Sequence, residues 1–124
     1  MTAAHSTRAT ILLAHGSRDP LWHRPVEAVA ERIRQLSPSS EVRCAYMEMS
    51  TPDLAASADE LVRIGISVIT IVPMFLGIGK HAREDIPVLL ARLIAAHPQV
   101  TFDLRPAIGE DAQIIELMAR ISLS

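Results

Sequence analysis

The sequence is poor in aromatic residues and carries no block of like charges. Its aromatic side chains are Trp22, Tyr46, Phe75 and Phe102, too few for a surface on which nucleic-acid bases could stack. The 12 basic and 14 acidic residues give a net charge of −2 and are spread along the chain. These absences argue against a nucleic-acid partner, and they require a core built from aliphatic side chains.

Cysteine and long apolar runs are also scarce. Cys44 is the one cysteine of the chain, which excludes an internal disulfide and a zinc site made of cysteines, and its apolar sequence context predicts a small buried side chain. No apolar run approaches the ~20 residues of a membrane-spanning helix. Residues 1–10 lack the apolar stretch of a secretion signal. We therefore expect a cytoplasmic protein with no membrane partner.

The remaining composition is typical of a globular protein, with 49% apolar and 21% charged residues. A chain of 124 residues is the length of one domain. A domain of this size buries roughly two-thirds of the surface that its unfolded chain exposes. We expect a single domain over residues 1–124, in which residues 1–7 form a frayed tail.

Short apolar runs alternate with stretches in which apolar residues recur at helical spacing. Strands are predicted over residues 8–14, 41–47, 66–74 and 100–104, and a helix is predicted after each of them. Thr51 is the predicted N-cap of the second helix, with Pro52 at its first position, and Gly65 ends that helix. The third run is the most hydrophobic, so its strand is expected in the middle of the sheet.

This alternation with short connections predicts an α/β fold: a doubly wound, mainly four-stranded parallel sheet with helices on both faces. In such a sheet, ligands bind in the crevice outside the carboxyl ends of the strands. Four loops are expected to meet at this edge, over residues 15–18, 48–51, 76–81 and 106–110.

Two histidines and one acid fall in these loops. His15 follows the first predicted strand, Glu48 the second and His81 the third. Neutral imidazole binds Fe, Co, Ni and Zn ions, and a carboxylate can complete a metal site or accept a proton. The pattern therefore predicts a site for metal or proton chemistry. His5, His23 and His97 lie in the tail and at helix ends, and we expect no metal role for them.

Three familiar motifs are incomplete in this chain. Gly79-Lys80-His81 lacks the final Ser or Thr of a nucleotide phosphate-binding loop. His15 is preceded by Ala14, where a histidine phosphatase needs arginine. Ser17 lacks the Gly-x-Ser-x-Gly frame of a hydrolase nucleophile. The sequence thus gives no support to nucleotide binding, to phosphatase chemistry or to serine hydrolysis.

Three segments give the chain a resemblance to a known family. They are ILLAHGSR (residues 11–18), AYMEMSTPDL (45–54) and VPMFLGIGKHAREDIP (72–87). In order and spacing they are similar to the small CbiX-type sirohydrochlorin cobaltochelatases and the sirohydrochlorin ferrochelatases, the class II chelatases. The likeness spans nearly the whole chain and is weakest after Val100. It implies a chelatase-like half-domain that inserts a divalent metal ion into sirohydrochlorin during cobalamin or siroheme biosynthesis.

The resemblance also implies roles for individual residues. Carried over by position, His15 and His81 hold the metal ion, and Glu48 lies near the macrocycle as the proton acceptor. Sirohydrochlorin carries many carboxylates, so basic side chains and backbone donors at the same edge are expected to bind its periphery. The expected substrate-binding residues are Ser17, Arg18, Gly77, Gly79, Lys80, Arg83 and Arg105.

In this scheme the metal ion is a substrate, and no organic cofactor is expected. Co²⁺ is expected first and Fe²⁺ next, with Ni²⁺ also compatible, because imidazole affinity alone does not select among these ions. The chain has neither the histidine-rich tail nor the extra cysteines that some relatives carry. Longer chelatases of this type contain two such domains facing a cleft, so the resemblance implies a homodimer of this chain.

Two other functions stay open at this point. A non-catalytic carrier of metal or tetrapyrrole would use the same two histidines but would need no base at Glu48. An unrelated flavodoxin-like interaction module would carry the histidines incidentally. Metal insertion into the tetrapyrrole separates the first hypothesis from both.

Overall fold

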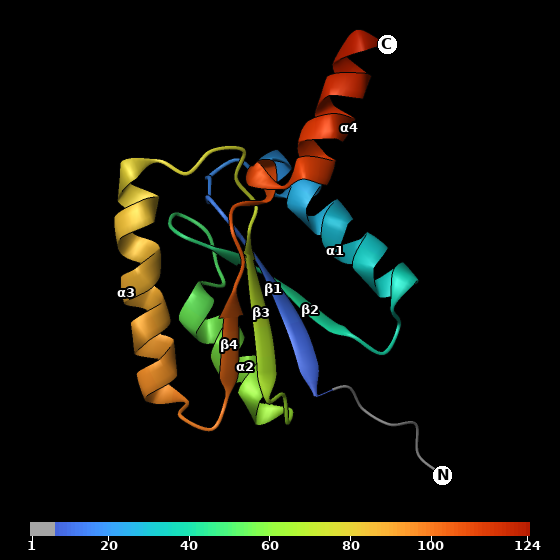
Figure 1. Ribbon diagram of the computed structural model, residues 1–124. Coiled ribbons are helices and arrows are strands. Elements are labelled where there is room, and N and C mark those ends of the chain that lie inside the picture. Colours follow the sequence, from blue (N-terminus) through green and yellow to red (C-terminus); the bar gives the residue numbers. More distant parts are fainter. Residues whose placement is uncertain (1–6) are drawn as a thin grey trace.

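The computed structural model describes residues 7–124 and contains one four-stranded parallel sheet (Figure 1). Its strands are β1 (Arg8–Ala14), β2 (Glu41–Tyr46), β3 (Val68–Pro73) and β4 (Thr101–Leu104), in the order β2-β1-β3-β4. In the register of the sheet, Leu12 lies opposite Cys44 on one side and Val72 on the other. The predicted α/β fold is confirmed, and the most hydrophobic strand, β3, lies inside the sheet as expected.

Four helices connect and follow the strands. They are α1 (Arg24–Leu36), α2 (Leu54–Arg63), α3 (Lys80–Ala96) and α4 (Ala112–Leu123), with short 3-10 helices η1 (Pro20–His23) and η2 (Ile108–Glu110) before α1 and α4. The predicted cap of α2 at Thr51 is wrong. Asp53 is the N-cap, since its carboxylate accepts a hydrogen bond from the Ala56 amide at 2.8 Å. Lys80 and His81, expected in a loop, form the first turn of α3.

The helices cover the two faces of the sheet unequally. On one face, α2 and α3 bury the larger core, which includes Ile11, Leu13, Ile69 and Ile71. On the other face, α1 packs over β1 and β2 and buries a smaller core, which includes Leu12, Val42 and Tyr46. Within residues 7–124 no helix lies over the β3–β4 half of this second face, because α4 rises beyond the carboxyl ends of the strands instead (Figure 1).

The amino-terminal tail and Cys44 were both subjects of sequence predictions. Residues 1–6, including His5, lie outside the described residues, so most of the predicted frayed tail is untested. The carbonyl of Thr7 accepts hydrogen bonds from the amides of Ser67 and Val68 at 2.9 and 3.1 Å.

Cys44 is half-buried against the smaller core, and this burial raises the pKa of its thiol. None of the helices described has the length and apolar character needed to cross a membrane.

Candidate active site at the carboxyl edge of the sheet

His15 and Glu48 meet at the carboxyl edge of the sheet. His15 directly follows β1, and Glu48 lies two residues after β2. The two strands are parallel neighbours that end together, with Ala14 opposite Tyr46, so their loops leave the sheet side by side. The Nδ1 atom of His15 lies 3.1 Å from the Oε1 atom of Glu48, and both side chains are about half exposed. The structure thus pairs an imidazole and a carboxylate where solutes can reach them.

The pairing determines which nitrogen of His15 is free. A carboxylate accepts hydrogen bonds, so Nδ1 carries a hydrogen and donates a hydrogen bond to Glu48. In the neutral ring the lone pair that can bind a metal ion is then on Nε2, and a carboxylate behind the ring is a common partner of metal-binding histidines. The second carboxylate oxygen of Glu48, Oε2, has no hydrogen bond within residues 7–124. It is free to accept a proton.

Gly16 allows the two loops to approach closely. Its amide donates to Oε1 of Glu48 at 3.2 Å. A Cβ atom at this position would overlap the carbonyl oxygen of Glu48, so a side chain cannot be accommodated there without moving the loop. The same loop turns at Met49, whose φ of 63° lies in the left-handed region that non-glycine residues seldom adopt. The backbone around Glu48 is therefore closely constrained.

A serine and a third histidine also join the two loops. The hydroxyl of Ser50 accepts a hydrogen bond from the Ser17 amide and donates one to the Ser17 carbonyl, both at 2.9 Å. His23 lies 2.8 Å away and donates its Nε2 proton to the same hydroxyl, whose own proton is already used. The ring of His23 lies against Tyr46, with 4.5 Å between ring centroids. We predicted no metal role for His23; here it supports the loops that carry His15 and Glu48.

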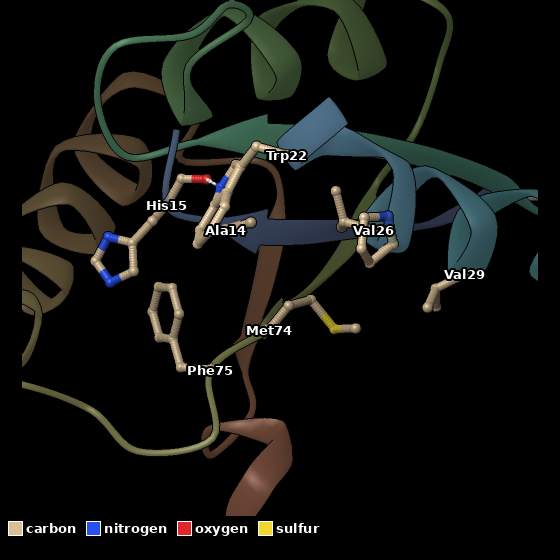
Figure 2. Close-up of a pocket in the computed structure, with 8 residues that line it drawn as sticks. Ala14, His15, Trp22, Val26, Val29, Met74 and Phe75 are labelled. Carbon is tan, nitrogen blue, oxygen red and sulfur yellow. Dashed lines mark hydrogen bonds between the residues drawn. The ribbon is translucent and has the colours of Figure 1, made fainter. Parts of the chain in front are cut away.

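An apolar pocket lies next to His15 (Figure 2). Its volume is about 310 Å³. The Phe75 ring lies under the imidazole of His15, with 4.5 Å between centroids, and the indole Nε1 of Trp22 donates to the His15 carbonyl at 2.8 Å. The remaining lining residues are Ala14, Pro25, Val26, Val29 and Met74. Two of the four aromatic residues thus gather beside His15, on segments far apart in the sequence.

His81 stands apart from this pair. It lies in the first turn of α3, and its exposed side chain makes no hydrogen bond, ion pair or ring contact with any other described residue. Across residues 7–124, no three His, Cys, Asp or Glu side chains are grouped closely enough to hold a metal ion. His81 follows β3, the neighbour of β1, so it belongs to the same edge of the sheet. Its role as a metal ligand stays a prediction.

The predicted substrate-binding residues are spread along the edge. Ser17 uses its hydroxyl to accept the Asp19 amide at 3.0 Å. The side chains of Arg18 and Lys80 are exposed and make no polar contact with other residues of the described chain. Gly77 and Gly79 have open space around them.

Two more of these residues lie together at the β4 end of the edge. Arg83 and Arg105 line a common cavity of about 310 Å³. Arg83 donates to the Ile78 carbonyl at 3.0 Å, and Arg105 lies 3.7 Å from the Asp103 carboxylate. His15 and Glu48 follow β1 and β2, at the other end of the edge. The structure therefore does not gather all the predicted cations around His15.

Comparisons with known proteins agree on one family. The sequence model of the CbiX family matches residues 9–122. A sirohydrochlorin cobaltochelatase of Methanopyrus kandleri is 33% identical over 82 residues, which cover 66% of this chain and 57% of that protein. A crystal structure of a CbiX protein from Marinobacter aquaeolei is 34% identical, with a TM-score of 0.80, and the match covers 94% of this chain and 93% of that one.

A longer protein shares the fold. The sirohydrochlorin chelatase SirB of Bacillus subtilis subspecies spizizenii, solved with cobalt, gives a TM-score of 0.77 at 23% identity. The match covers 93% of this chain but 50% of that one. The fold described above therefore occurs in about half of a chain twice as long.

Proposed function

Because this chain belongs to the CbiX family, we propose that it inserts a divalent metal ion into sirohydrochlorin, with Co²⁺ as the first candidate and Fe²⁺ as the next. Its relative in Methanopyrus kandleri is a sirohydrochlorin cobaltochelatase, of whose length the match covers 57%. The observation that carries the proposal is the His15–Glu48 pair. It presents the Nε2 atom of an imidazole and a free carboxylate oxygen at an open edge, beside an apolar pocket.

Metal insertion requires three events that these groups can support. The ion must lose water, the macrocycle must be held so that its nitrogens face the ion, and two pyrrolic protons must leave. The Nε2 atom of His15 serves as a ligand, with His81 as the second, and the open coordination positions face the ring. Oε2 of Glu48 accepts one of the two protons as the metal enters, and the other leaves to water at the open edge. Trp22 and Phe75 provide apolar contact for the face of the macrocycle.

The periphery of the substrate needs cations. Sirohydrochlorin is rich in carboxylates, and guanidinium groups bind carboxylates through paired hydrogen bonds. Arg18 and Lys80 lie free at the edge of the sheet, and Arg83 and Arg105 share a cavity at its β4 end. We assign these four residues, with Ser17, Gly77 and Gly79, to binding of the substrate periphery.

One copy of the chain offers only one wall to a flat macrocycle. The pocket beside His15 measures about 310 Å³, at the small end of ligand sites. We therefore include self-association in the proposal: two copies face each other across the substrate in a symmetric dimer. We also retain the expectation that the protein works in the cytoplasm.

Anaerobic insertion assays with single variants test the proposal. His15→Ala and His81→Ala should each weaken Co²⁺ binding, measured by calorimetric titration, and nearly abolish the change in the visible spectrum that marks metal insertion. His97→Ala is the matched control, because His97 pairs with Asp59 at 2.8 Å, outside the proposed site. It should change neither measurement. Unchanged cobalt affinity in both edge variants would refute the proposed ligands.

Glu48→Gln separates the enzyme from a carrier. Glutamine keeps an oxygen acceptor for His15 and Gly16 but cannot take up a proton. A general base contributes on the order of 10² to 10⁴ in rate, so the variant should bind tetrapyrrole normally and insert metal at least ~100-fold more slowly by that estimate. Stopped-flow spectra within a few-fold of the wild type would mean that Glu48 only orients His15, and would favour the carrier.

A further inference from the structure

Met49 occupies the apex of a tight turn directly after Glu48. The Ser50 amide donates to the Glu48 carbonyl at 2.8 Å, and Met49 between them has a φ of 63°, so the three residues close a γ-turn. Glycine adopts a positive φ readily, and asparagine is enriched among the residues that do so. The needs of the backbone therefore do not explain a long apolar side chain at this position.

Burial does not explain Met49 either. Its side chain is 63% exposed, whereas Met47, two residues earlier in the same loop, packs against the larger core. Met49 thus neither eases the turn nor adds to the core. A rare backbone conformation beside an ionisable group is typical of a functional site, where it presents a side chain in one fixed position.

Leu76 has the same character in the loop after β3. It is 70% exposed and follows Phe75, whose ring lies under the His15 imidazole. The Gly109 amide donates to the Phe75 carbonyl at 2.9 Å, and a Cβ atom on Gly109 would overlap the backbone of Leu76. This close approach of η2 holds the loop in place. An exposed leucine is therefore carried on a backbone that has no room to move and bury it.

The strand order places these two side chains on opposite sides of the proposed metal ligand. Strand β1 lies between β2 and β3, so the loop that carries His15 lies between the loop with Met49 and the loop with Leu76 (Figure 1). Three neighbouring strands span only about 10 Å. A flat ring placed over His15 therefore reaches both loops.

We propose that Met49 and Leu76 form an aliphatic rim that holds the apolar face of the tetrapyrrole over His15 and Glu48. The conjugated ring of a tetrapyrrole has apolar faces and carries its carboxylates at the periphery, so it needs apolar contacts at its centre and cations around them. Because both side chains stand on constrained backbone, little conformational freedom is lost when the ring binds. The inference rests on the proposed function and adds two substrate-contacting residues to it.

Variants of Met49 separate contact with the substrate from a role in the turn. Met49→Asn keeps a residue suited to a positive φ but removes the apolar contact. Its affinity for metal-free sirohydrochlorin, measured by calorimetric titration without oxygen, should fall about tenfold. Met49→Leu keeps the apolar contact and should bind like the wild type. Both variants should retain the Co²⁺ affinity of the wild type, because the rim does not bind the ion.

Leu76→Gln tests the other side of the rim and should also weaken sirohydrochlorin binding about tenfold. Leu36→Gln is the matched control, since Leu36 is 68% exposed but ends α1 before β2 begins, at the opposite edge of the sheet. It should bind like the wild type, and a loss equal to that of Leu76→Gln would overturn the proposal.

The same titrations distinguish this inference from the proposed function. If the wild type binds sirohydrochlorin and both Met49→Asn and Leu76→Gln bind it equally well, the aliphatic rim is refuted and the proposed function is untouched. If the wild type binds no sirohydrochlorin, the proposed function fails and the inference fails with it.

Discussion

At the scale of single residues, the carboxyl edge depends on one glycine as much as on its ionisable groups. Gly16 lies between His15 and the backbone of Glu48, and its amide shares an acceptor oxygen with His15. A Cβ atom on Gly16 would overlap the backbone carbonyl of Glu48. Because a backbone carbonyl cannot move aside as a side chain can, the two loops would have to separate. The position of the His15 imidazole thus depends on Gly16, which has no side chain.

Gly16→Ala should therefore destabilise the fold and disrupt the His15–Glu48 pair. Overpacking typically costs about 1–3 kcal/mol, and we expect at least ~2 kcal/mol here in urea unfolding, because the clash is with backbone. Gly77→Ala is the control, since nothing lies near a Cβ atom there. Its stability should stay close to that of the wild type. Equal stabilities for the two variants would contradict the close approach of the loops.

The sequence predicted that His15 and Glu48 lie at one edge, but it did not predict the residues that support them. The proximity of His15 and Glu48 could be predicted because each comes within two residues of the end of an apolar strand, and parallel strands end at one edge. The supporting roles of Ser50, His23 and Trp22 could not, because they come from hydrogen bonds between loops up to 33 residues apart. Their only signal in the sequence is proximity to the predicted edge.

At the scale of elements, hydrophobicity was enough to predict the strands, whereas the helix ends depend on local hydrogen bonds. The run over residues 8–14 matches β1, since a buried strand of a parallel sheet is apolar on both faces. The start of α2 was misplaced because two capping residues, Thr51 and Asp53, lie two positions apart and only the hydrogen bond to Ala56 distinguishes them. For α4, periodicity predicted the apolar face but not its exposure, since no residue of this helix is buried.

Helix α2 contains a buried hydroxyl that tests its packing. Ser57 is 1% exposed, and its Oγ atom has no hydrogen-bond partner within the described part of the chain. An unpaired buried polar group costs about 1–3 kcal/mol, so Ser57→Ala should raise the free energy of unfolding by roughly 1 kcal/mol. Ser122→Ala is the matched control on α4, where the hydroxyl bonds the Met118 carbonyl at 2.7 Å. A destabilised Ser57→Ala protein would mean that the hydroxyl has a partner.

At the scale of the whole molecule, the fold of this chain occupies about half of a longer solved chain. The match to the Bacillus SirB structure covers 50% of that chain, whereas the match to the Marinobacter CbiX structure covers 93% of its chain. If two copies of this chain pair, as proposed above, pairing depends on concentration and the free energy of unfolding becomes a property of two molecules.

The melting temperature should accordingly rise with protein concentration. A 100-fold increase adds about 2.7 kcal/mol to a linked equilibrium, which corresponds to roughly 5 °C or more for a dimer of this size. Calorimetric scans of the wild type that coincide over this range would argue against a dimer that is coupled to folding.

The contact between Trp22 and the His15 carbonyl has an optical consequence. Trp22 is the one tryptophan of the chain, and it lies on the wall of the pocket beside the proposed metal ligand. All indole fluorescence of the protein therefore originates within a few residues of His15. Emission from the unlabelled protein reports directly on this edge, and paramagnetic cobalt or a coloured macrocycle arriving there would quench it.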